Sequence, residues 1–194
     1  IVWQNLHPLL EKDGERFLTL AAKADLAKSP GLAKVLPRAI DRILGNPSGD
    51  PAAVIGFVEK LIAKDKDSAA ATLCLAGLSA RIINKEMPVK QVAAVRKQFG
   101  DKLTGMQKGS SGPLAHEATL LLAALGERGG IVGAGELFQN SQVGSRVRVR
   151  ALETLVRTGE SKSILPHVER VLGGKHGSAD FRGDVLGALT FAPA

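Results

Sequence analysis

Hydrophobic residues recur every three or four positions along most of this chain, and turn-forming residues separate the runs. A typical run spaces its apolar residues along one helix face: Leu32, Val35, Leu36 and Ile40. Pro37 lies inside this run and is expected to kink or split the helix. Similar runs predict about ten or eleven helices, and none alternates apolar and polar residues for long enough to predict a strand. The expected fold class is therefore all-α.

The second half of the chain repeats itself. The segment 116–127, HEATLLLAALGE, returns at 149–160 as VRALETLVRTGE, and a looser copy follows at 181–189. Each copy is a short apolar helix followed by a turn, and a second helix fits between successive copies. This pattern, with a period in the thirties, is typical of an α-solenoid of antiparallel helix pairs. Leu122, Leu155 and Leu189 are then expected to be buried at equivalent places.

The same pattern sets the expected domain organisation. We predict one helical-repeat domain over residues 1–194, with less regular helix pairs in 1–108 and more regular repeats in 112–194. The chain begins at Ile1 and enters a helix at once, so we expect it to be a fragment of a longer protein. No apolar run approaches the roughly 20 residues that cross a membrane, so membrane insertion is not expected.

The residue types that most often carry chemistry are scattered. The one cysteine, Cys74, lies in an apolar run and is expected to act as a buried hydrophobic residue. The glycines between 126 and 135 lack the third glycine of a dinucleotide fingerprint, because Phe138 occupies that position. No two histidines are three or four residues apart: they are His7, His116, His167 and His176. We therefore expect no catalytic residue, no cofactor and no metal in this chain.

The formal charge of +7 is unevenly distributed, and this is the remaining candidate for a functional signal. Basic residues outnumber acidic ones between positions 81 and 108, and they define a possible basic surface: Arg81, Lys85, Lys90, Arg96, Lys97 and Lys102, followed by Lys108. Such a surface could hold a phosphate backbone. Alternatively, these side chains merely solvate a helix face. Nucleic acid is the less favoured partner, because only 4% of residues are aromatic and none is tyrosine.

Three arginines alternate at the start of the repeat helix near position 147. Arg146 and Arg150 share a helix face, whereas Arg148 points elsewhere, so they do not form one patch. An arginine here is expected to have a structural role, pairing with an acidic turn residue of the neighbouring repeat.

Two segments resemble known families. The segment 147–155, VRVRALETL, resembles the first helix of a HEAT repeat. The segment 1–10, IVWQNLHPLL, together with Ser29-Pro30 and Leu36-Pro37-Arg38, resembles the HEAT region of large planctomycete-type membrane-bound dehydrogenase/cytochrome c proteins. Members of that family join a β-propeller, a HEAT-like region and a C-terminal haem-binding domain, and they are exported. The resemblance implies an exported or periplasmic parent protein. It transfers no catalytic residue, since neither the propeller nor the haem motif lies in this sequence.

The leading hypothesis is a non-catalytic HEAT-like scaffold, a spacer or docking region of a larger exported protein. Its partners would be the flanking domains of the parent chain or another protein. The alternative is a basic nucleic-acid-binding helical-repeat protein of the HEAT-like DNA glycosylase type.

Overall fold

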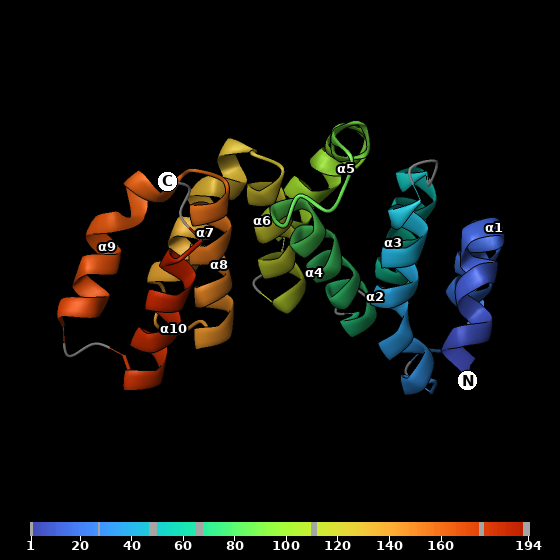
Figure 1. Cartoon of the computed structure of the whole chain (residues 1–194), viewed down its shortest axis with the longest axis horizontal. Helices are drawn as coiled ribbons and strands as arrows, with labels where there is room; N and C mark the ends of the chain where they lie inside the picture. Colours follow the sequence, from blue (N-terminus) through green and yellow to red (C-terminus); the bar gives the residue numbers. More distant parts are fainter. Residues whose placement is uncertain are drawn as a thin grey trace. The chain divides into compact units, whose positions relative to one another are not determined.

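The structure is a computed structural model that describes residues 2–26, 28–46, 50–64, 68–109, 112–174 and 177–191. Within these residues it contains ten α-helices and no strand, which confirms the all-α prediction (Figure 1). The helices are α1 (Val2–Lys23), α2 (Pro30–Gly45), α3 (Pro51–Lys64), α4 (Ala69–Ile83), α5 (Val89–Gly109), α6 (Pro113–Ala124), α7 (Arg128–Gln139), α8 (Ser145–Arg157), α9 (Ser161–Gly173) and α10 (Ala179–Leu189). The chain divides into two compact units, Ile1–Glu117 and Ala118–Ala194.

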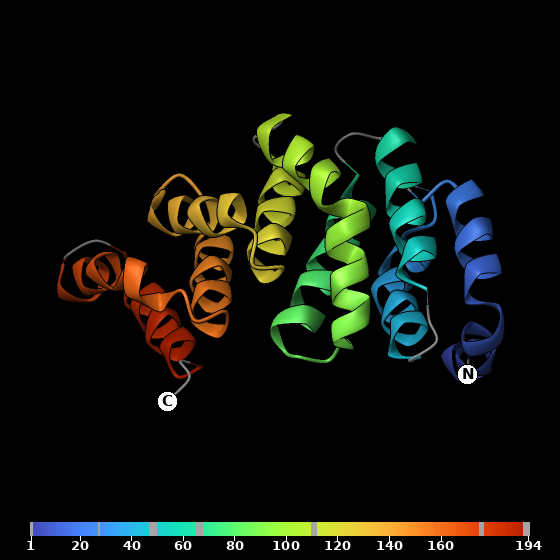
Figure 2. The ribbon, with the colours of Figure 1, turned by 90° about the horizontal axis from the view of Figure 1, so that it is seen from above.

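The helices of the first unit stack in two layers. Helix α3 packs against α1 and α5 in one layer, and α2 packs against α4 in the other. In Figure 2, α3 (teal) stands between α1 (blue) and α5 (green). Contacts of α1 with α2, and of α3 with α4, join the layers. Helix α3 has the most neighbours, and its buried residues Val54, Phe57, Val58 and Leu61 accordingly recur at helical spacing.

Helix α1 is interrupted in the middle. The sequence predicts two helices here, over 1–12 and 15–24. The structure agrees: α1 consists of two helical segments that meet at a kink, where Asp13 takes a non-helical conformation with φ −127° and ψ 29°. The next residue, Gly14, is buried where α1 meets α2, and a Cβ atom on it would lie 2.6 Å from Cγ1 of Ile43. The break and the missing side chain together allow this close approach.

Of the two outcomes expected at Pro37, a kink or a split, the split does not occur: helix α2 runs through Pro37. Proline removes one hydrogen bond and distorts a helix, but it does not end the helix when packing holds both halves. Here Leu36, Ala39 and Ile40 on either side of Pro37 are all buried. Their burial compensates for the lost bond.

The second unit is organised around α8, which packs against α7, α9 and α10. Its core includes Leu120, Phe138, Leu152 and Val185 together with Leu155. Figure 1 shows α8 beside α7 and α10.

Two of the three repeat leucines are buried as predicted. Leu122 is 2% exposed and Leu155 is 1% exposed. Leu189 is only partly buried against the core, because it is the last residue of α10. In that helix Phe181, Val185 and Ala188 supply the buried face instead.

The sequence repeat corresponds to a repeated helix ending. Gly126 and Gly159 both have positive φ, 76° and 82°. The amides of the following residues, Glu127 and Glu160, donate to the carbonyls of Leu122 and Leu155 at 2.9 and 2.8 Å. These bonds form the Schellman motif, in which glycine takes the left-handed position after a helix. The two copies of the repeat therefore share a backbone conformation as well as a hydrophobic pattern.

Candidate functional site

The predicted basic residues do not form one continuous surface. Arg81 departs most clearly from the prediction. Its side chain is only 12% exposed and reaches from α4 to α2. It forms an ion pair with Asp41, and it donates hydrogen bonds to the backbone carbonyls of Asp41 and Glu86 at 3.2 and 2.9 Å. Arg81 therefore ties the two helices together and is not a surface charge.

Lys85 is exposed, but the backbone determines its role. It has a positive φ of 59°, and its amide donates to the carbonyl of Ile82. The amide of Glu86 donates to the carbonyl of Arg81 at 2.9 Å. These bonds form the same cap that follows α6 and α8, with lysine in the position that favours glycine.

The remaining basic residues lie on α5 but face different directions. The buried side of α5 carries Gln91, Val95, Phe99 and Leu103. At 100° per residue, Lys90, Lys97 and Lys108 fall together on the opposite side of the helix. Arg96 and Lys102 fall on its two flanks.

Lys102 is further set apart because it forms an ion pair with Glu59 of α3. Both side chains are partly exposed, so this pair contributes little to stability. Only Lys90, Lys97 and Lys108 thus make a single basic stripe.

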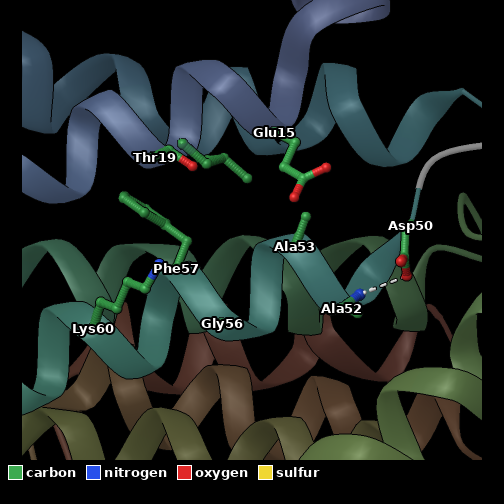
Figure 3. Close-up of a pocket in the computed structure, with 9 residues that line it drawn as sticks. Glu15, Thr19, Asp50, Ala52, Ala53, Gly56, Phe57 and Lys60 are labelled. Atoms are coloured by element: carbon green, nitrogen blue, oxygen red, sulfur yellow. Dashed lines mark hydrogen bonds between the residues drawn. The ribbon is translucent and has the colours of Figure 1, made fainter.

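A cavity of about 300 Å³ lies between α1 and α3 (Figure 3). Glu15 and Thr19 point into it from α1, and Phe57 and Lys60 line it from α3. Asp50 is at one end, where its carboxylate accepts a hydrogen bond from the amide of Ala52 at 2.8 Å and caps α3. The cavity has carboxylates at one end and an ammonium group at the other.

A second hollow, of about 510 Å³, lies between α3 and α5 and is mostly apolar. Ile62, Met106 and Leu114 line it, and the pair of Lys102 with Glu59 lies at its edge. Such a lining would accommodate an apolar side chain of a partner better than a substrate undergoing a reaction.

A third hollow, of about 350 Å³, collects charged groups that the sequence reading did not bring together. It is lined by His7 of α1, by Arg38, Asp41, Arg42 and Gly45 of α2, and by Arg81 of α4. Burial raises the pKa of Asp41, and the charge of Arg81 partly opposes this shift. The sequence does contain one signal for this hollow: the spacing of positions 38, 41, 42 and 45 places them on one helix face. Arg81 could be added only once α2 and α4 were known to be neighbours.

The described residues contain no group of three or more histidine, cysteine or acidic side chains placed to hold a metal ion. Cys74 is fully buried, and burial raises the pKa of its thiol to about 12, so the reactive thiolate is suppressed. His7, His116 and His167 are on three different helices, and His176 lies outside the described residues. No helix in the described part of the chain is long and apolar enough to cross a membrane.

Arg148 has a structural role, as expected, but its partner differs from the prediction. Its Nε donates to the carbonyl of Phe138 at 2.8 Å, and its guanidinium lies 4.3 Å from the centre of the Phe181 ring. No acidic turn residue is needed, because a helix-end carbonyl and an aromatic face satisfy the cation. Partial burial lowers the pKa of Arg148. Arg148 thus links α7, α8 and α10.

No family model, curated protein or solved structure matches this chain in comparisons of sequence and fold.

Proposed function

We propose that this chain is a non-catalytic helical-repeat scaffold, which holds flanking domains or a partner protein at a set geometry. The observation that carries the proposal is the two-layer stacking of the first unit, with α1, α3 and α5 in one layer and α2 and α4 in the other. Stacked helices of this kind bury one face against their neighbours and leave the other faces available as broad surfaces.

The Schellman motifs that end both α6 and α8 support the proposal that the chain is built from helical repeats. A HEAT-like solenoid built from antiparallel helix pairs would have such recurring units. We further propose that the parent is an exported dehydrogenase/cytochrome-like protein. This rests on the resemblance carried by residues 1–10 together with Ser29-Pro30 and Leu36-Pro37-Arg38. In that case the chain would act as a spacer between a catalytic and a haem-binding part.

A second candidate function is binding to nucleic acid. The alignment of Lys90, Lys97 and Lys108 along the exposed side of α5 favours it, because a row of cations can follow a phosphate backbone. Against it, Arg81 is engaged with Asp41 and Lys102 with Glu59, so the stripe is short. We consider the scaffold to be the better supported function.

Titration with duplex DNA tests the choice between these functions. At physiological salt we expect binding of about micromolar strength or weaker, falling steeply as salt is added, as for non-specific attraction. A variant in which Lys90, Lys97 and Lys108 are all changed to Gln should keep the helical circular dichroism spectrum. It should lose only this weak binding.

The matched control neutralises three other exposed lysines: Lys12, Lys34 and Lys162. Both variants remove the same charge, so general attraction should fall by about the same amount in each. Nanomolar binding by the natural chain that only the α5 variant loses would overturn the scaffold as the main function.

A further inference from the structure

Three arginines meet in the hollow between α1, α2 and α4. Arg38 and Arg42 come from α2, and Arg81 comes from α4. Gly45, one turn beyond Arg42, leaves room beside this cluster: a Cβ atom there would lie 3.9 Å from Nη2 of Arg81. The cavity of about 350 Å³ is large enough for one or two small side chains of a partner.

Two of the three guanidinium groups already have acidic partners. Arg81 pairs with Asp41, and Arg42 pairs with Glu11 of α1. Arg38 is exposed and forms no hydrogen bond or ion pair within the described part of the chain. Glu86 is a third acidic group near the cluster, because its charge acts on Asp41. Arg38 therefore carries the one guanidinium of the three that has no acidic partner among the described residues.

The guanidinium groups also retain hydrogen-bonding capacity. The Nε atoms of Arg42 and Arg81 are buried and have no acceptor among the described residues. A buried hydrogen-bond donor without an acceptor lowers the stability of the fold, and a negative charge nearby reduces that loss. Both arginines line the hollow, so the charge of an anion bound there would act on their guanidinium groups.

We propose that this hollow binds a carboxylate carried by an acidic segment of a partner protein, with Arg38 as the main contact. Arginine forks match the planar geometry of a carboxylate. The one unpaired guanidinium matches the single charge of one carboxylate, whereas a phosphate dianion would bring a second negative charge close to Asp41, Glu11 and Glu86. The proposal rests on the proposed scaffold function, because it names the chemistry of the partner.

The test titrates the full chain with synthetic hexaglutamate, with hexaglutamine and with inorganic phosphate, followed by heteronuclear NMR. Hexaglutamate should shift the signals of residues 36–45 and the Nε–H signals of Arg42 and Arg81, and hexaglutamine should not. Arg38→Gln should weaken hexaglutamate binding about tenfold, the loss expected for one charge-assisted hydrogen bond.

Arg16→Gln is the matched control, because Arg16 is an exposed arginine of α1 outside the hollow. It should weaken binding less than about twofold, since it changes only the overall charge. Any one of four results would overturn the proposal. Two concern the natural chain: no binding of hexaglutamate, or tighter binding of phosphate than of hexaglutamate. The other two are an equal loss of affinity in the two variants and NMR shifts that are confined to α5. The DNA titration would be unaffected by any of these outcomes, so the scaffold proposal and this one fail separately.

Discussion

Gly130 is the position where this fold depends most sharply on a missing side chain. It is buried in the first turn of α7, against the end of α6. A Cβ atom on Gly130 would lie 2.3 Å from the backbone nitrogen of Ala123 and 2.4 Å from the carbonyl carbon of Leu122. Backbone atoms cannot rotate away as side chains do, so Gly130→Ala requires α7 to move away from α6.

The expected cost follows from these distances. Ordinary contacts of a Cβ atom begin at 3.4 Å, so the two helices must separate locally by about an ångström. Overfilling a packed core typically costs about 1–3 kcal/mol, and more when the backbone must shift. Replacing a glycine inside a helix by alanine by itself raises the free energy of unfolding by about 0.5–1 kcal/mol. Because the clash is with backbone atoms, the cost of overfilling lies at or above the upper end of its range. We therefore expect Gly130→Ala to lower the free energy of unfolding by about 2 kcal/mol or more.

Gly135→Ala is the matched control in the same helix. Its Cβ atom would meet only Cδ1 of Ile164, at an ordinary 3.9 Å. We expect it to raise the free energy of unfolding by about 0.5–1 kcal/mol. The assay is urea unfolding followed by circular dichroism. If Gly130→Ala stayed within about 0.5 kcal/mol of the natural chain at an unchanged m-value, the close approach of α6 and α7 would be wrong.

Three further substitutions test the packing and the caps by the same assay. Leu155→Ala should cost about 2–5 kcal/mol, because Leu155 lies in the core of the second unit, and a loss well under 1 kcal/mol would contradict that placement. Gly14→Ala should cost about 1–2 kcal/mol, less than Gly130→Ala, because the side chain of Ile43 can partly yield; an unchanged stability would contradict the contact. Lys85→Gly should raise stability by about 0.5–1 kcal/mol, since glycine adopts the positive φ without strain, and a clear loss would argue against the cap.

Local patterns predicted the helices and the repeat. The 33-residue recurrence from 122 to 155 is visible as sequence, and both leucines are buried. Gly126 and Gly159 follow the repeated helices in both copies, which is where a Schellman glycine belongs. Short-range periodicity carries this information, so it can be read without the fold.

Contacts between distant segments could not be predicted in this way. Arg81 was assigned to a basic surface because the sequence around it is basic, yet its partner Asp41 lies forty residues earlier. Lys102 and Glu59 are likewise brought together only by the packing of α3 against α5. The direction of a long side chain depends on which helices are neighbours, and a helical pattern alone does not contain that information.

If the chain is a scaffold, the stacked helices of the first unit must hold a set geometry. The most direct test is a distance distribution between spin labels at Arg16→Cys on α1 and Gln98→Cys on α5, two exposed positions on either side of α3. Labelling should be clean, because the native Cys74 is fully buried with its thiol pKa raised to about 12. We expect one narrow distribution that urea broadens only as the helices unfold. A broad or multiple distribution in a fully helical chain would contradict the scaffold.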